Sequence, residues 1–166
     1  RDPGYIKGYL PGVRENGGQY NHAGVWALMA LAQLGRRDAA WDVFTMLSPA
    51  HRAADAEGVA RYGLEPYVMA GDVYTHAPWQ GRGGWSWYTG SAGWMYRLVI
   101  ESLLGLTLQV DEDGARLLID PCLPVGWTSY HIDYRFRETP YSIDFDVAGG
   151  TTPSVSVDGN LLPGNS

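Results

Sequence analysis

Residues 23–34 read AGVWALMALAQL, and this stretch decides the fold class because it predicts a helix with almost no polar face. A helix that is apolar nearly all round lies buried between other elements. Gly35 supplies the stop of this helix. A second helix is predicted over about 38–47 and ends at Ser48-Pro49, so that the two form a helical hairpin with a short connection.

A third apolar helix is predicted over about 92–104, with Thr89 or Ser91 as its cap and Gly105 as its stop. Three helices this apolar do not make a self-sufficient domain, because each needs neighbours to cover it. We therefore expect the chain to be a piece of a longer protein. Its start at Arg1 rather than at a methionine agrees with that expectation.

The segments between these helices are rich in glycine and proline or lack a clear period. Residues 1–20 and 76–90 predict loops, and 50–63 predicts a loop with at most a fragment of helix. Residues 65–74 are short and apolar and fit either a helix or a strand.

Beyond Leu106 the period of the pattern becomes two, which indicates strands. A hairpin turn signature stands at Asp111-Glu112-Asp113-Gly114. The strands around it predict an antiparallel sheet with one solvent-exposed face. The fold class is thus α+β, with a helical part at 1–106 and a small β domain at 107–166. The predicted strands are 107–110, 116–119, 127–137 and 141–147, and residues 155–162 predict a last hairpin.

The composition excludes several classes of protein. The chain has 166 residues, 45% of them hydrophobic, which suits one ordinary globular domain and excludes a disordered or collagen-like chain. The formal charge is −6 and there is no basic run, so nucleic acid is a poor partner. No stretch approaches the length of a membrane span, and no signal peptide is visible.

Two loops are too rich in polar and aromatic residues to be plain connectors. The first, Pro11–His22, holds a cation, a carboxylate, three amides, a phenol and an imidazole and ends where a buried helix begins. Free N–H groups at a helix start favour anions, so this loop is a candidate anion site. The alternative is a polar loop held by its own hydrogen bonds, with His22 as an ordinary helix-start residue.

The second loop, Gly81–Gly93, reads GRGGWSWYTGSAG. Thr89, Gly90 and Ser91 precede a helix, so backbone N–H groups and two hydroxyls could cradle a phosphate there. The alternative is that the tryptophans belong to the core and the glycines allow tight packing. Tryptophan and tyrosine beside a polar cleft also suit the C–H faces of sugars.

Other kinds of site lack their residue patterns. The four histidines show no metal spacing, and there is no G-x-S-x-G elbow for a serine nucleophile. Cys122 is the single cysteine; it cannot form an internal disulfide, and we expect it to be structural. Glu101 is expected on a helix face in a structural role. We therefore expect neither a metal nor an organic cofactor.

Four segments are distinctive: RENGGQYNH at 14–22, EPYV at 65–68, GRGGWSWYTGSAGWMYR at 81–97 and DPCLP at 120–124. In this order they resemble glycoside hydrolase family 94, and the resemblance covers roughly residues 4–147. Its members include cellobiose, cellodextrin, chitobiose and 1,2-β-oligoglucan phosphorylases and the C-terminal region of cyclic β-1,2-glucan synthases. The tryptophan-rich segment looks most like the glucan synthase and oligoglucan branch.

The resemblance implies a fold and a reaction. The fold is an (α/α)6 barrel followed by a small β domain, so this chain would hold the last barrel helices and the C-terminal sheet. The reaction is inverting phosphorolysis of a β-glucosidic bond, in which phosphate is the co-substrate and α-glucose 1-phosphate the product. Because phosphate is already an anionic nucleophile, one carboxylic acid is enough to protonate the leaving oxygen.

The resemblance also assigns roles to individual residues. His22, Thr89 and Gly90 match phosphate-binding positions of the family. Glu15 matches a carboxylate that binds sugar hydroxyls near the scissile bond, and Arg14 and Tyr9 fall at the leaving-sugar subsite. No catalytic residue is expected within this chain.

The departures from the family pattern concern upstream residues and one sugar contact. The general-acid aspartate and a phosphate-binding arginine of the family lie upstream of the matching region, so we expect the chain to be inactive alone. Where cellobiose-type members place a sugar-binding glutamine, this sequence has Ala70-Gly71-Asp72, which disfavours a cellobiose substrate. The implied partners are a β-glucan oligosaccharide or disaccharide, phosphate, the upstream part of the same chain and a second copy in a homodimer. The implied location is the cytoplasm, or the cytoplasmic side of the inner membrane for a glucan synthase.

Three alternatives to a phosphorylase stay open. One is a hydrolase on a similar barrel, which strict phosphate dependence would separate. Another is a non-catalytic module for glucan binding or chain-length control. The third is a structural module whose aromatic residues only form a core.

Overall fold

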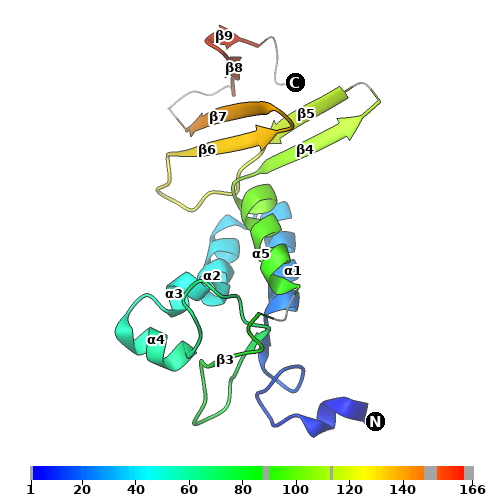
Figure 1. Ribbon diagram of the computed structural model, residues 1–166, viewed down its shortest axis with the longest axis vertical. Coiled ribbons are helices and arrows are strands. Elements are labelled where there is room, and N and C mark those ends of the chain that lie inside the picture. Colours follow the sequence, from blue (N-terminus) through cyan, green and yellow to red (C-terminus); the bar gives the residue numbers. More distant parts are fainter. Residues whose placement is uncertain (1, 88–89, 113, 148–152, 163–166) are drawn as a thin grey trace. The chain divides into compact units, whose positions relative to one another are not determined.

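The computed structural model describes residues 2–87, 90–112, 114–147 and 153–162. The chain forms two compact units, Arg1–Pro124 and Val125–Ser166, and each is described by itself (Figure 1). The first unit contains η1 (Gly4–Gly8), β1 (Gln19–Tyr20), α1 (Asn21–Gln33), α2 (Arg37–Leu47), α3 (Pro49–Arg52), α4 (Ala56–Tyr62), β2 (Asp72–Val73), β3 (Gly83–Gly84), α5 (Ser91–Arg97), η2 (Leu98–Leu103), β4 (Leu106–Asp111) and β5 (Gly114–Ile119). The second contains β6 (Ser129–Phe136), β7 (Thr139–Asp146), β8 (Ser156–Val157) and β9 (Asn160–Leu161).

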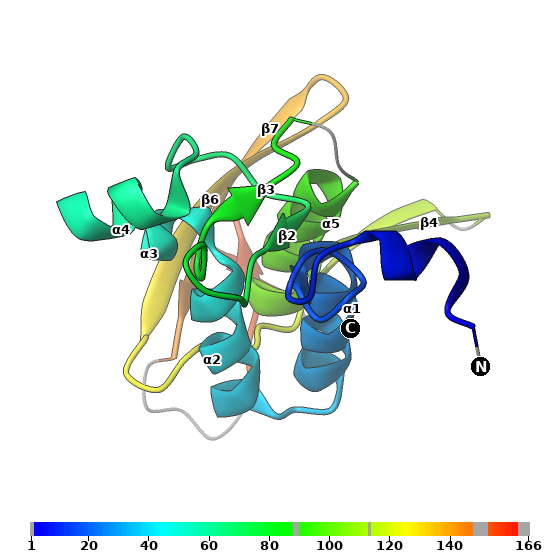
Figure 2. The ribbon, with the colours of Figure 1, turned by 90° about the horizontal axis from the view of Figure 1, so that it is seen from below.

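The core of the first unit forms where α1 packs against α2 and against the continuous helical run of α5 and η2. Figures 1 and 2 both show α1 and α5 side by side. The predicted helices at 23–34 and 38–47 are confirmed, each beginning one or two residues earlier than expected. Burial of α1 is one-sided, because Trp26 and Leu34 on its other side are 52% and 74% exposed. The buried residues of this core are Val25, Leu28, Ala40, Leu47, Met69, Met95, Leu98, Leu103 and Cys122.

The expectation of a loop over 50–63 is wrong, because α3 and α4 occupy most of it. Their end signals are local. Pro49 stands in the first turn of α3, where its missing N–H is not needed. Asp55 caps α4, since its Oδ1 accepts the backbone N–H of Gly58 at 2.7 Å, and Gly63 ends α4 at a φ of +66°.

The third predicted helix is present, but it changes type halfway. α5 has α-helical geometry, and η2 continues it as a π-helix. The N–H of Leu104 accordingly reaches back to the carbonyl of Val99 at 2.8 Å. Arg97 Nε donates to Glu101 Oε2 at 2.6 Å, which agrees with a structural role for Glu101. Cys122 is buried, and its carbonyl accepts the indole N–H of Trp41 at 2.6 Å, which agrees with a structural role as well.

A small three-stranded sheet, β1-β2-β3, was not predicted. Its strands are two residues long, too short to show a period of two, and β3 consists of glycines. β2 is the central strand and pairs antiparallel with both neighbours. Tyr20 is therefore opposite Asp72, and Asp72 is opposite Gly84. This sheet joins the first polar loop, the segment after Glu65 and the tryptophan-rich loop, which are far apart in the sequence.

The β-rich part forms hairpins rather than the single sheet that the alternation predicted. Among the described strands, β4–β5, β6–β7 and β8–β9 each form a two-stranded antiparallel sheet. The alternation itself is confirmed in β6, where Tyr130, Ile132 and Tyr134 are half-buried and the residues between them are exposed. Register between separate hairpins depends on contacts that a period of two does not encode.

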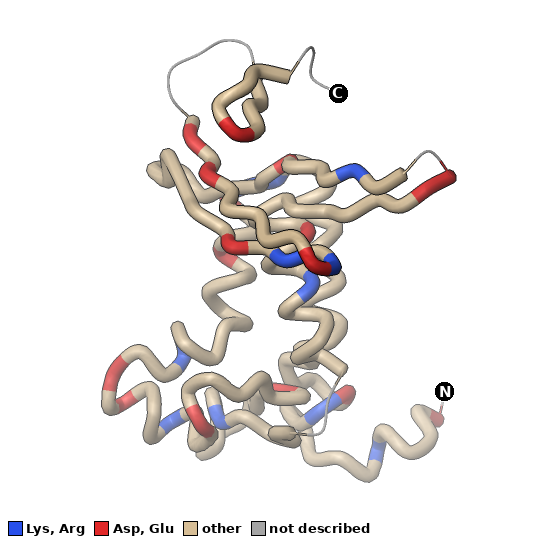
Figure 3. Tube along the Cα trace, turned by 45° about the horizontal axis from the view of Figure 1, so that its top comes forward, with Lys and Arg blue, Asp and Glu red and all other residues tan. Residues whose placement is uncertain are grey.

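Charged residues are dispersed along the described chain, and basic and acidic positions are interspersed (Figure 3). Within the described residues, no helix has the length and apolar character needed to cross a bilayer. Nor does this part of the chain bring together three His, Cys, Asp or Glu side chains in an arrangement that could hold a metal ion.

Candidate functional site

A cavity of about 260 Å³ lies in the first unit, beside the start of α1 and the start of α5. Four separate segments build it: the first polar loop, the end of β1 with the first turn of α1, the central strand β2, and the tryptophan-rich loop. It is lined by Arg14, Tyr20, His22, Gly71, Asp72, Trp85 and Gly90.

His22 lies in the first turn of α1, on the wall of this cavity. Its ring contacts Trp26 edge-on at 4.6 Å between centroids and Trp94 at 6.0 Å. These rings fix the imidazole plane. Its Nε2 is buried and has no hydrogen-bond partner among the described residues. A buried polar atom without a partner costs free energy, so a ligand that hydrogen-bonds this ring would be favoured.

Gly90 places the start of α5 against the imidazole. It occupies the N-cap position, and its carbonyl accepts the N–H of Trp94 at 3.1 Å. A methyl group added at Gly90 would lie 3.5 Å from Cε1 of His22 and 3.8 Å from Nδ1. His22 and Gly90, which the sequence assigned together to phosphate binding, therefore meet in the structure. Thr89, the third residue of that assignment, lies outside the described residues.

Arg14 forms another part of the cavity wall. Its guanidinium carbon lies 4.2 Å from the centroid of the Trp85 ring and 5.2 Å from that of Tyr9, so the cation is held by two aromatic faces. Nε of Arg14 is 3.4 Å from Oε2 of Glu15, an ion-pair distance without hydrogen-bond geometry. Burial acts most strongly on the pKa of Arg14 and lowers it. The charge of Glu15 and the phenols of Tyr9 and Tyr20 outweigh this, so the pKa is raised overall.

The predicted sugar residues are thus grouped around Arg14. Tyr9 and Glu15 contact Arg14, and neither lines the cavity itself. The loop that carries them is closed by its own hydrogen bonds: the N–H of Gly12 donates to the carbonyl of Asn16 at 2.7 Å, and the N–H of Gly18 donates to that of Arg14 at 2.9 Å.

Asp72 is a site residue to which the sequence alone assigned no role. Its side chain lies on β2 and is 1% exposed. Oδ2 accepts the backbone N–H of Arg14 at 2.6 Å, and Oδ1 has no partner among the described residues. Burial raises the pKa of this carboxyl, because it penalises the charged form. The sequence signal was a carboxylate within the apolar run PYVMAGDVY, where an aspartate needs a partner.

Two tryptophans of the second loop, and a third just before it, are not core residues. Trp79, Trp85 and Trp87 are 53%, 49% and 73% exposed. The interpretation that they only fill the core is therefore wrong for this chain. Trp85 also has a left-handed φ of +58°, a costly conformation for a bulky residue, and faces the cavity.

A larger cavity, of about 490 Å³, contains none of the predicted site residues. It lies on the other face of the β1-β2-β3 sheet, because Gln19 and Val73 line it while their neighbours Tyr20 and Asp72 line the smaller cavity. We assign the candidate site to the smaller cavity, because Arg14, His22 and Asp72 each leave a buried polar atom without a hydrogen-bond partner there, whereas Arg52 alone does so among the described residues that line the larger one. The larger one is lined by Gln19, Arg52, Arg61, Val73, Tyr74, Thr75, Gln80 and Gly81.

Comparison with known proteins shows the family. Residues 1–105 match the model of the glycosyl hydrolase 94 superfamily, catalytic domain. The chain therefore belongs to this family, and the resemblance seen in its loops is confirmed.

Three curated relatives illustrate the range of the family. The chain is 45% identical over 163 residues to the cyclic beta-(1,2)-glucan synthase NdvB of Rhizobium meliloti (strain 1021), covering 97% of this chain and 6% of that protein. It is 29% identical to the N,N'-diacetylchitobiose phosphorylase of Vibrio furnissii, covering 93% of this chain and 18% of the relative. It is 31% identical to the cellobionic acid phosphorylase of Neurospora crassa, covering 94% of this chain and 19% of that protein. The chain thus spans less than a fifth of the length of each of these relatives.

Proposed function

We propose that the protein carrying this chain is an inverting glycoside phosphorylase that cleaves a β-glucosidic bond with inorganic phosphate and releases α-glucose 1-phosphate. The observation that carries the proposal is the meeting of His22 with Gly90 at the start of α5, where the buried Nε2 has no partner. Membership of the family and the phosphorylases among its relatives support the same reaction.

In this proposal, the two ends of the cavity have different roles. His22, Thr89 and Gly90 bind phosphate: the imidazole donates a hydrogen bond, and the α5 start supplies backbone N–H groups. Arg14, Glu15 and Tyr9 bind the sugar on the other side. No base is needed, because phosphate attacks the anomeric carbon as an anion, and the general acid comes from a segment upstream of this chain.

The branch and the surroundings are part of the same proposal. The higher identity to the glucan synthase favours a β-1,2-glucan substrate over cellobiose. The helices of the first unit would complete an (α/α)6 barrel with upstream helices, in keeping with the exposed Trp26 and Leu34. We expect a homodimer, acting in the cytoplasm or on the cytoplasmic side of the inner membrane.

The test is phosphate-dependent release of α-glucose 1-phosphate by the full protein from β-1,2-, β-1,3- and β-1,4-linked glucose oligomers. The His22→Ala variant should lose this release. His51→Ala is the matched control, because His51 lies in α3, packs on Phe44 at 5.7 Å and is outside the cavity. We expect the 166-residue chain alone to be inactive.

Each other outcome points to a different function. Sugar release without phosphate would make the protein a hydrolase and remove His22 and Gly90 from phosphate binding. No release from any substrate by a folded full protein would favour a glucan-binding or chain-length-control module. For such a module, the exposed rings of Trp79, Trp87 and Tyr67 are the features suited to sugar faces.

A further inference from the structure

Asp72 poses a physical question, because a carboxylate in this position is costly. It lies on the central strand of the small sheet, its side chain is 1% exposed, and burial raises its pKa. A buried charged group is tolerated when hydrogen bonds and an opposite charge compensate for the lost hydration. The structure should therefore contain a hydrogen-bond donor that compensates for the burial of this carboxylate.

The group it holds is the backbone of Arg14. The N–H of Arg14 donates to Oδ2 of Asp72 at 2.6 Å, a contact between residues 58 positions apart. Arg14 has a φ of +50°, in the left-handed region that a side chain rarely adopts. The bond with Asp72 therefore stabilises a backbone conformation that costs free energy.

The loop around Arg14 is closely packed at its glycines. A methyl group at Gly18 would lie 2.7 Å from the nitrogen of Arg14, and one at Gly12 would lie 2.7 Å from the backbone nitrogen of His76. On the other side of the carboxylate, a methyl at Gly84 would lie 2.6 Å from Oδ1 of Asp72. Glycines thus let the loop, Arg14 and Asp72 pack at close range.

The consequence is the direction of the Arg14 side chain. With its backbone held in this conformation, its guanidinium lies between the rings of Trp85 and Tyr9, at 4.2 and 5.2 Å, and lines the cavity. Released from the left-handed conformation, the Cα–Cβ bond would point elsewhere and this wall of the cavity would be lost.

We propose that Asp72 is a positioning residue, which holds Arg14 in its left-handed conformation and thereby builds the sugar-binding wall of the cavity. The inference rests on the proposed function for the identity of the ligand. The inference adds that the acceptor oxygen of Asp72 sets the affinity for the sugar through Arg14. In this role Asp72 does not itself contact phosphate or the reacting atoms.

The test uses variants of the full protein and compares KM for the sugar with KM for phosphate. Asp72→Ala should raise KM for the sugar about tenfold or more, since a buried N–H left without its acceptor costs about that factor, and should leave KM for phosphate near its original value. Asp72→Asn keeps an acceptor oxygen for the Arg14 N–H and should rescue sugar binding. If Asp72→Asn fails as Asp72→Ala does, the charge itself is needed, and the positioning role is refuted.

Combining two variants distinguishes a positioning role of Asp72 from a general effect on the stability of the protein. Arg14→Ala removes the guanidinium, so adding Asp72→Ala to it should change KM for the sugar no further. Tyr62→Phe is the matched control: Tyr62 is equally buried nearby, its hydroxyl bonds Val68 and Ala70, and it does not line the cavity. Additive effects of the two site variants, or an equal rise in sugar KM for Tyr62→Phe, would overturn the proposal.

A second readout does not depend on activity. Amide hydrogen exchange over residues 12–18 should speed up in Asp72→Ala and not in Asp72→Asn, because only the first removes the acceptor of the Arg14 N–H. Unchanged exchange in Asp72→Ala would refute the contact even in an active enzyme. Altered exchange in a protein without phosphorolysis would keep the contact and discard the proposed reaction instead.

Discussion

The substitution Gly90→Ala separates folding from phosphate binding at the start of α5. Gly90 has φ −69° and ψ −13°, a conformation that alanine adopts without strain. The added methyl would lie 3.5 and 3.8 Å from Cε1 and Nδ1 of His22, which are ordinary contact distances. We therefore expect the free energy of unfolding to fall by less than about 1 kcal/mol, the usual difference between glycine and alanine at an N-cap.

The same methyl would narrow the cavity where Gly90 meets His22, at the surface against which we place phosphate. Losing one charge-assisted hydrogen bond to phosphate costs about 1.5–3 kcal/mol. KM for phosphate should therefore rise about 10- to 100-fold, since each 1.4 kcal/mol or so is a factor of ten. KM for the glucan should change little, because Arg14 and its neighbours are untouched.

The assay is the rate of α-glucose 1-phosphate release by the full protein as a function of phosphate concentration, with thermal unfolding measured alongside. Gly93→Ala is the matched control: it makes the same change three residues on in α5, at a position with nothing within 4 Å. We expect this control to keep KM for phosphate.

Two results would refute the reasoning. If Gly90→Ala folds normally and its KM for phosphate stays within about a factor of two of the original, phosphate does not bind between His22 and Gly90. If Gly93→Ala raises KM for phosphate equally, the effect belongs to the helix as a whole and not to the contact with His22.

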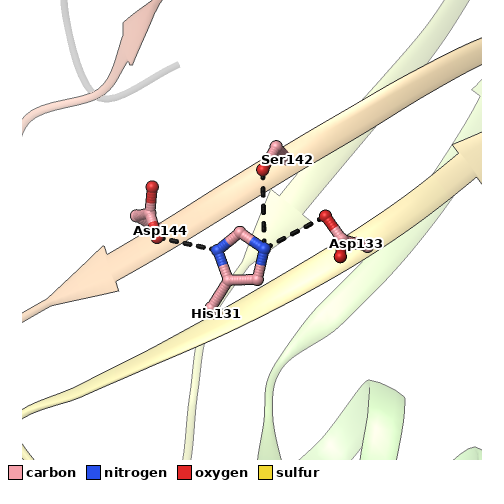
Figure 4. A network of polar contacts seen from close by, with 4 residues as sticks. All are labelled: His131, Asp133, Ser142 and Asp144. Atoms are coloured by element: carbon pink, nitrogen blue, oxygen red, sulfur yellow. Dashed lines mark hydrogen bonds and ion pairs between the residues drawn. The ribbon is translucent and has the colours of Figure 1, made fainter.

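Three further predictions concern stability. Gly105→Ala should lower the free energy of unfolding of the full protein by about 2–5 kcal/mol in denaturant titration, because it adds left-handed strain to a 2.2 Å clash with the backbone of Asp120. Hydrogen bonds to Asp144 and Asp133 raise the pKa of His131 in the β6–β7 hairpin (Figure 4). This histidine should therefore stabilise the hairpin below about pH 6.5 and lose that effect as the pH passes its raised pKa. His131→Gln should flatten the pH dependence of hairpin unfolding, followed by NMR. Burial raises the pKa of Asp72, so its charge should cost stability once the pH exceeds 3.8, and the stability of Asp72→Asn relative to the original should increase with pH in the same titrations.

Much of the helical structure follows from the sequence because its causes are local. α1 and α2 are apolar stretches with a glycine or a Ser-Pro at their ends, and both lie within two residues of the prediction. The segment 50–63 was misjudged, although Asp55 and Gly63 are ordinary cap residues, because the region lacks a long apolar stripe. The transition from α5 to a π-helix has no signal in the pattern.

The candidate site could be predicted in part. The sequence named His22, Gly90 and Arg14, and all three line one cavity. It gave no role to Asp72 or Trp85, which line the same cavity, because nothing near either residue along the chain shows what it contacts.

The sequence by itself therefore determined α1, α2, the helical run that begins with α5, the alternating strands and, through four segments, the family. Only the tertiary structure decided that Asp72 holds Arg14 and that Arg14 lies on Trp85. The physical reason is the register of the β1-β2-β3 sheet, which places Tyr20, Asp72 and Gly84 in one row. Periodicity reports how a segment faces its surroundings, whereas a contact across 58 residues depends on which segments pair and in what register.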